Sequence, residues 1–226
     1  MEKRLLLKKY SFNENIGIIS NESSDIGSGH VSRCLNLISQ IKNNKRSFYF
    51  FSSSRIDLKK TKKIKNILID RNIISTKHNN KLYLKYKLNI IKYNIQYLII
   101  DSYQINIALE KKLRKLVKVL IIFDDYYWRK HNCDVLINNN FLNSYQKKYI
   151  KKLHPNTKLL IGEKYLLLNK FFYKNKLKVR LRKKFRKIFI FFGNSEPNSE
   201  TFKLLKILKK FSNIKINCII GKYSKD

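Results

Sequence analysis

Short apolar runs alternate along the chain with longer stretches in which apolar residues recur every three or four positions. The apolar runs are typical of strands buried on both faces, and the periodic stretches are typical of the helices that cover them. Strands are predicted at Ile16–Ser20, Ser47–Ser52, Tyr97–Asp101, Val119–Asp124, Asp134–Ile137, Lys158–Ile161, Ile188–Phe192 and Ile214–Ile220. Helices are predicted at Val31–Lys42, Asp57–Asp70, Leu82–Tyr93, Ile105–Leu116 and Glu200–Phe211. This alternation predicts an α/β protein with a mostly parallel sheet covered on both faces.

Polar side chains gather directly after the predicted strands, where a parallel α/β sheet binds its ligands. Four loops carry them, at residues 21–30, 101–103, 124–125 and 193–197. Asp101 and Ser102 could instead cap the following helix. The adjacent acids Asp124 and Asp125 repel each other unless something uses them, although one could pair with a nearby lysine.

The first of these loops holds two glycines and a histidine in a strand-to-helix turn. Gly27 and Gly29 would let a ligand approach the backbone, and the first N–H groups of the helix would be available to it. The helix end disfavours a protonated imidazole, so His30 is a candidate neutral general base. The alternative is a turn shaped by geometry alone with His30 as a cap. Ser32 stands where a dinucleotide-binding fingerprint has its third glycine, which argues against a nicotinamide-dependent oxidoreductase.

The chain of 226 residues is very basic, with 50 Lys and Arg against 15 Asp and Glu and a formal net charge of +35. A nucleic-acid partner is one interpretation of such a charge. However, the lysines are spread over nearly every segment and accompany many asparagines and isoleucines, with only 6 glycines and 2 prolines. This joint bias favours a solvated lysine-rich surface, and a basic nucleic-acid-binding protein stays the alternative from another class.

The three cysteines, Cys34, Cys133 and Cys218, lie far apart and form no CxxC pair, which favours a reducing compartment and no structural metal. The apolar patch Leu5–Leu7 is too short for a signal peptide. No apolar run approaches the roughly 20 residues that cross a bilayer. We therefore expect a cytoplasmic protein without a membrane segment.

The spacing of the elements predicts three parts: a first domain over residues 1–164, a linker over 165–186 and a second domain over 187–226. The second part holds one strand, one helix and one strand, which is a marginal core. We expect the sequence to end part-way through this domain. The last predicted strand, with Cys218 and its isoleucines, should then be more exposed than the strands of the first part.

A series of short motifs, taken in order, resembles the UDP-sugar hydrolase family of pseudaminic acid biosynthesis. The motifs are Ile26–Leu35, Ile100–Tyr103, Phe123–Asp125, Cys133–Asp134, Gly162–Leu168 and Phe192–Glu196. The resemblance implies a glycosyltransferase-B-like (GT-B) fold with a Rossmann-like N-terminal domain. It also implies release of UDP from a UDP-linked 2,4-diacetamido-2,4,6-trideoxy sugar, without metal or cofactor. The order and spacing of the motifs carry the resemblance, since each motif alone is weak.

The resemblance also assigns roles to individual residues. His30 matches the catalytic histidine that helps water to attack the anomeric carbon, and Tyr103 matches the tyrosine that positions water or sugar. The substrate-binding positions implied are Gly27, Ser28, Gly29, Arg33, Asp101, Gly193, Asn194 and Ser195. A GT-B glycosyltransferase, with an acceptor hydroxyl in place of water, is the alternative of the same fold.

The chain departs from the family at three points. The nucleotide-binding turn reads Gly193-Asn194-Ser195-Glu196, with one glycine fewer than the family has. Asn21 occupies the end of the first strand, where the family has an acidic residue. The family also extends roughly another hundred residues, with later segments that bind uridine. We therefore expect an activity impaired by truncation, or a second polypeptide that carries the missing part.

Overall fold

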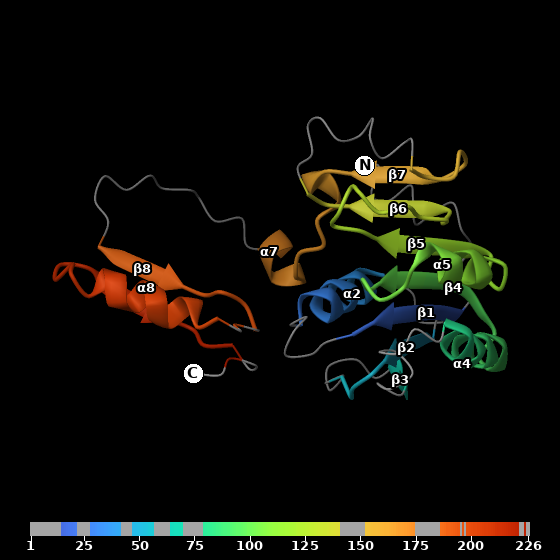
Figure 1. Cartoon of the computed structure of the whole chain (residues 1–226), viewed down its shortest axis with the longest axis horizontal. Helices are drawn as coiled ribbons and strands as arrows, with labels where there is room; N and C mark the ends of the chain where they lie inside the picture. The colour runs from blue at the N-terminus through green and yellow to red at the C-terminus, as the bar shows by residue number, and fades with distance from the viewer. Residues whose placement is uncertain are drawn as a thin grey trace.

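Seven parallel strands form the main sheet of the computed structural model, which describes residues 15–21, 28–41, 47–56, 64–69, 79–140, 152–174, 186–194, 196, 198–221 and 224. The strand order is β3-β2-β1-β4-β5-β6-β7 (Figure 1). The strands are β1 (Asn15–Ser20), β2 (Phe48–Ser52), β3 (Ile64–Leu68), β4 (Ile95–Asp101), β5 (Val119–Phe123), β6 (Val135–Asn138) and β7 (Lys158–Ile161). The order reverses between β1 and β4, and such a switch point is where open parallel sheets bind ligands.

Helices cover both faces of this sheet because successive residues of each strand point to opposite sides. On one face Ile18 and its neighbours pack against helix α2 (Gly29–Gln40). On the other face Ile19 and its neighbours pack against α4 (Asn79–Lys92) and α5 (Ile107–Arg114). Ile18 and Ile19 are both fully buried. The predicted α/β class with a parallel sheet covered on both faces is therefore confirmed.

A second, two-stranded parallel sheet pairs β8 (Lys187–Ile190) with β9 (Lys215–Cys218), and α8 (Glu200–Leu208) connects them. Apolar side chains of this unit remain exposed. Phe189 is 64% exposed and Ile220 is 56% exposed, whereas the core side chains of β1 are nearly inaccessible. Cys218 is exposed as well. The predicted difference in exposure between the last strand and those of the main sheet is confirmed.

The predicted helix over Asp57–Asp70 is wrong within the described residues, because Ile64–Leu68 forms strand β3. This strand lies at the edge of the sheet and is only half-buried, so Lys65 and Asn66 interrupt its apolar residues and hide the strand pattern. Asn66 fixes its position by donating to the backbone carbonyl of Phe50 at 3.1 Å and to the Ser52 hydroxyl at 2.8 Å. Residues 57–63 lie outside the described residues.

Two short helices that the pattern did not predict follow β7. They are the 3₁₀ helix η1 (Glu163–Tyr165) and α7 (Lys170–Lys174). The segment between them packs on α2, where Asn36 donates to the carbonyl of Leu167 at 3.3 Å and Gln40 donates to that of Leu168 at 3.0 Å. Part of the predicted linker is thus ordered against the main sheet, and the division into domains at residues 164 and 186 stays a prediction.

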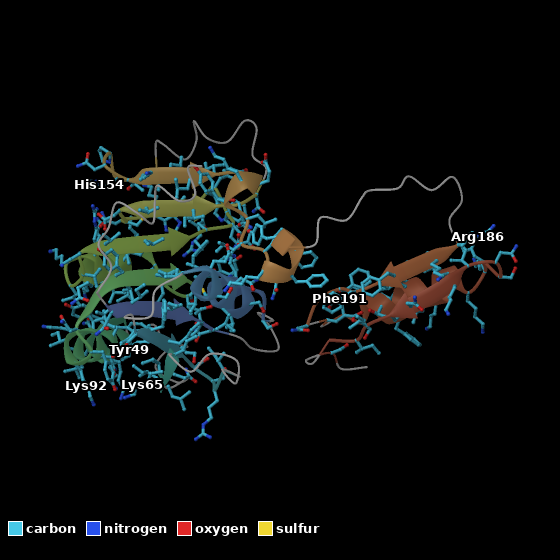
Figure 2. All side chains as sticks on the ribbon, turned by 180° about the vertical axis from the view of Figure 1, so that it is seen from behind. Tyr49, Lys65, Lys92, His154, Arg186 and Phe191 are labelled. Atoms are coloured by element: carbon cyan, nitrogen blue, oxygen red, sulfur yellow. The ribbon has the colours of Figure 1, made fainter. Side chains whose placement is uncertain are left out.

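Some surface lysines make specific contacts with aromatic rings. Tyr49 and Tyr93 stack with ring centroids 4.6 Å apart, and the ammonium groups of Lys65 and Lys92 lie 4.8 and 5.5 Å from the centre of the Tyr93 ring. Tyr49, Lys65 and Lys92 accordingly gather at one edge of the molecule (Figure 2). Such cation–π contacts stabilise the fold, so some of the many lysines have a structural role.

Candidate functional site

His30 lies in the first turn of α2 and faces the end of β4. Its Nδ1 atom is 2.6 Å from Oδ1 of Asp101, whose carboxylate is 1% exposed. Because an ionised carboxylate only accepts hydrogen bonds, Nδ1 carries the proton and donates it to Asp101. The imidazole is then oriented with its other nitrogen, Nε2, available to accept a proton from a bound molecule. Asp101 therefore orients His30, and the cap of the following helix is Asn106 instead.

Arg33, one turn further along α2, connects the two carboxylates of the site. Its five N–H groups find five acceptor contacts: two with Asp101 at 2.6 and 2.8 Å, two with Asp125 at 2.7 and 3.0 Å, and one with the Asn139 side chain at 3.3 Å. The guanidinium also lies 5.0 Å from the centre of the Phe123 ring. An arginine bound in this way fixes the geometry of the site rather than offering hydrogen bonds to a ligand.

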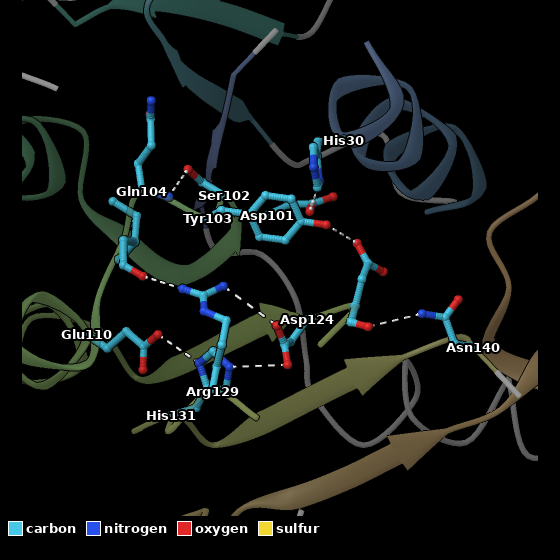
Figure 3. A network of polar contacts seen from close by, with 12 residues as sticks. His30, Asp101, Ser102, Tyr103, Gln104, Glu110, Asp124, Arg129, His131 and Asn140 are labelled. Carbon is cyan, nitrogen blue, oxygen red and sulfur yellow. Dashed lines mark hydrogen bonds and ion pairs between the residues drawn. The ribbon is translucent and has the colours of Figure 1, made fainter. Parts of the chain in front are cut away.

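Tyr103 and Asp125 complete the site from the loops after β4 and β5. The hydroxyl of Tyr103 donates to Oδ2 of Asp125 at 2.8 Å. The rings of His30 and Tyr103 meet edge to face, with centroids 4.7 Å apart. Figure 3 shows His30, Asp101 and Tyr103 grouped at the ends of these strands. The two predicted catalytic side chains are therefore neighbours, although 73 positions separate them in the sequence.

Burial and charge together set the ionisation of this group. Burial opposes the charge of Arg33, but hydrogen bonds to Asp101 and Asp125 outweigh it and raise the guanidinium pKa. Burial would raise the pKa of Asp125, but the hydrogen bonds and charge of Arg33 lower it overall. Burial, reinforced by the bond to Asp125, raises the pKa of Tyr103. Burial and the nearby Asp101 also raise the pKa of the Cys34 thiol. At neutral pH Tyr103 is thus a hydrogen-bond donor and not a base.

A second group of buried charges lies behind Asp125. His131 is fully buried, with Nδ1 2.8 Å from Oε1 of Glu110 and Nε2 3.4 Å from Oδ2 of Asp124 (Figure 3). The guanidinium of Arg129 lies 3.6 Å from Asp124 and donates to the carbonyl of Ile105 at 2.8 Å. Burial alone would lower the pKa of His131, but Asp124 and Glu110 raise it. Asp124 therefore pairs with an arginine and a histidine.

The side chain of Asn21, directly after β1, makes hydrogen bonds through both its amide nitrogen and its carbonyl oxygen. Its side-chain amide donates to Gln104 at 3.0 Å, and its carbonyl oxygen accepts from the backbone of Ser53 at 2.8 Å. A carboxylate could not make the first of these bonds, because it has no donor. Asn21 thus ties together the loops after β1, β2 and β4.

The remaining predicted binding residues belong to the start of α2 and to the turn after β8. The hydroxyl of Ser28 accepts a hydrogen bond from the side-chain amide of Asn194, which brings the two segments together. A Cβ at Gly29 would meet no atom of the described residues within 4 Å, so within this part of the chain open space lies in front of its backbone. Gly193 has φ +100°, a conformation that side chains disfavour. Gly27 and Ser195 lie outside the described residues.

The structure adds residues that the sequence did not single out, namely Glu110, Arg129 and Asn139. Among the described residues, no group of three or more His, Cys, Asp or Glu side chains is arranged to hold a metal ion. Searched over the same residues, the structure has no helix that is long and apolar enough to cross a membrane.

Known proteins share the fold and part of the sequence. The chain is similar to the crystal structure of Acinetobacter baumannii MurG, with a TM-score of 0.51 at 11% identity, covering 92% of this chain and 67% of that one. MurG has a GT-B fold, and the chain accordingly has a Rossmann-like α/β fold of the GT-B type. The similarity establishes the fold alone, since the sequences are so different.

In sequence, the chain is 32% identical over 216 residues to the uncharacterized protein MJ1062 of Methanocaldococcus jannaschii. The match covers 91% of this chain but only 42% of that protein, so the chain spans less than half the length of this relative. No protein-family model matches the chain.

Proposed function

We propose that the protein is a UDP-sugar hydrolase that releases UDP from a UDP-linked 2,4-diacetamido-2,4,6-trideoxy sugar. The observation that carries the proposal is the pair formed by His30 and Asp101 at the switch point of a GT-B-type sheet. The carboxylate of Asp101 accepts a hydrogen bond from Nδ1–H of His30 at 2.6 Å. The other ring nitrogen, Nε2, is then free of a proton and can act as a base. A histidine so oriented is suited to removing a proton from water as the water attacks a neighbouring carbon.

The reaction needs one bond to form and one to break. Water attacks the anomeric carbon, and His30 Nε2 accepts a proton from it. The bond from that carbon to the diphosphate oxygen breaks, and its electron pair leaves with UDP. Tyr103, kept protonated by its environment, would hold the water or a sugar oxygen by hydrogen bonding. Attack from the side opposite UDP inverts the configuration at the anomeric carbon.

The start of α2 supports an anionic leaving group on the other side of His30. Its first turn contains no acidic residue of its own, and the partial positive charge of the helix N-terminus favours an anion there. The backbone at Gly29 faces open space, and Ser28 contacts Asn194 of the turn after β8. These groups, with Gly27, Gly193 and Ser195, are the binding positions that the proposal assigns to the diphosphate.

The test is release of UDP from the UDP-linked diacetamido sugar, measured in water enriched in ¹⁸O. Hydrolysis at the anomeric carbon places the label in the free sugar, whereas attack at phosphorus places it in UDP. His30→Asn should lower turnover about a hundredfold or more, the scale of a lost general base. His154→Asn is the matched control, because His154 is exposed in the loop before β7, at the opposite ends of the parallel strands.

Three outcomes would contradict the proposal. The first is UDP release that requires an added acceptor alcohol, because it would establish a glycosyltransferase of the same GT-B fold. The second is full turnover in the His30→Asn variant of an active protein, because another group would then be the base. Equal losses in the His30 and His154 variants would likewise exclude a specific role for His30.

A further inference from the structure

Three exposed aromatic side chains form a row that begins at the candidate site. Tyr103, Tyr126 and Trp128 are 40%, 36% and 56% exposed. The ring centroids of Tyr103 and Tyr126 are 5.0 Å apart, and those of Tyr126 and Trp128 are 4.4 Å apart. Since His30 meets Tyr103 at 4.7 Å, the row is continuous with the proposed base. We name Tyr103, Tyr126 and Trp128 the aromatic row.

Buried charges hold the loop that carries two of these rings. The loop between β5 and β6 is fixed by Asp124 at its start and by Arg129 and His131 at its end. Glu110 of α5 secures the far end by accepting from the His131 ring and, at 2.8 Å, from the backbone N–H of Asn132 (Figure 3). Partners this deeply buried are costly to separate, so the loop is preorganised.

The underside of the row is supported as well. Tyr127 is half-buried against the main core and meets Trp128 edge to face at 5.5 Å. Lys152 donates to the backbone carbonyl of Trp128 at 3.3 Å and lies 5.9 Å from the centre of the Tyr127 ring. Tyr127 thus supports the Trp128 ring and Lys152 its backbone, while the residue is 56% exposed, which is an arrangement suited to stacking with a ring-shaped ligand.

From this geometry we infer that the aromatic row is the binding surface for the pyranose ring of the glycosyl group. The inference rests on the proposed function, which places the diphosphate toward Ser28 and Asn194. On one side of His30 lie Ser28 and Asn194, which the proposal assigns to the diphosphate. On the other side the aromatic row begins at Tyr103, where the sugar would lie. A trideoxy sugar with two acetamido groups presents methyl and C–H groups where other sugars present hydroxyls. Aromatic faces favour such apolar groups.

Trp128 makes the inference directly measurable, because it is the only tryptophan of the chain. Free 2,4-diacetamido-2,4,6-trideoxyaltrose should change Trp128 fluorescence with a saturable dependence on concentration. In Tyr126→Ala the apparent Kd should rise roughly tenfold, the scale of one lost aromatic contact. Phe202→Ala is the matched control, because Phe202 is 53% exposed on helix α8, which connects the strands of the second sheet. The apparent Kd of this variant for the sugar should be unchanged. N-acetylglucosamine, which carries more hydroxyls, should bind more weakly than the trideoxy sugar.

The same titration with uridine separates the two ring-shaped parts of the substrate. A response to uridine and none to the sugar would make the row a nucleobase site and overturn the inference, as would a response to neither. His30→Asn should still bind the sugar. Binding without hydrolysis would thus defeat the proposed function alone, and hydrolysis without any sugar response at Trp128 would defeat the aromatic row alone.

Discussion

Arg33→Met tests whether one arginine holds the candidate site together. The substitution keeps an unbranched side chain of similar length but removes the contacts to Asp101 and Asp125. Asp101, at 1% exposure, would then be a buried carboxylate without its main counter-charge. Breaking a buried ion pair from one side costs about 3–5 kcal/mol, and Arg33 is 15% exposed, so we expect a loss in this range.

The measurement is urea unfolding at pH 7, with Arg114→Met as the matched control. Arg114 also pairs with a carboxylate, Asp134, at 2.7 Å, but the two side chains are 24% and 30% exposed. Because this pair is more accessible to solvent than Arg33 and Asp101, its loss should cost less, about 1 kcal/mol. The lowered pKa of Asp125 adds a pH test. Its contribution is present above the unfolded pKa and is lost as pH falls through the folded pKa, so the gap between wild type and Arg33→Met should narrow on acidification.

Equal losses in the free energy of unfolding for the two arginine substitutions would refute this reasoning, because the buried pair would then contribute no more than the more exposed one. A double-mutant cycle with Asp101→Asn sharpens the result. If the buried charge causes the loss, Arg33→Met should cost clearly less in the Asp101→Asn background, since the neutral amide leaves no uncompensated carboxylate.

Three further predictions concern binding, ionisation and turnover. Gly29→Ala should leave the free energy of unfolding unchanged or up to about 1 kcal/mol higher, because its Cβ enters open space, yet it should weaken UDP-sugar binding in calorimetry if the diphosphate approaches there. His131→Gln should destabilise the fold most below pH about 6.5, and the difference should shrink as pH rises through the raised folded pKa; a difference independent of pH in urea unfolding would contradict the ionised pairing. Tyr103→Phe should lower turnover while changing stability by at most about 1 kcal/mol, because the lost bond to Asp125 is largely exposed; unchanged turnover would remove Tyr103 from the reaction.

The main strands were predictable because burial on both faces leaves continuous apolar runs. β1, β4 and β7 begin and end within two residues of their predicted bounds. β3 was missed because an edge strand needs apolar residues on only part of its surface, and the polar pair Lys65 and Asn66 breaks its apolar pattern. The short η1 and α7 were missed because helices of three and five residues are too short to show a period.

The candidate site was predictable as a set of loops but not as a set of contacts. His30, Asp101, Tyr103 and Asp125 stand out because polar groups directly follow apolar strands. The pairing of Arg33 with Asp125 spans 92 positions and depends on the strand order, which local patterns do not contain. Glu110 is hidden for another reason, since an acid in a lysine-rich helix ordinarily faces solvent, whereas here it is 1% exposed.

The three thiols differ in accessibility in a way that makes the native chain suitable for site-selective labelling. Cys34 and Cys133 are buried, and burial raises the pKa of both thiols, whereas Cys218 is exposed in β9. A maleimide dye should therefore react with Cys218 alone in the folded protein. Trp128, in the loop between β5 and β6, is the only tryptophan of the chain, so energy transfer from it to that dye would follow the separation of the two sheets as a ligand binds, without any engineered residue.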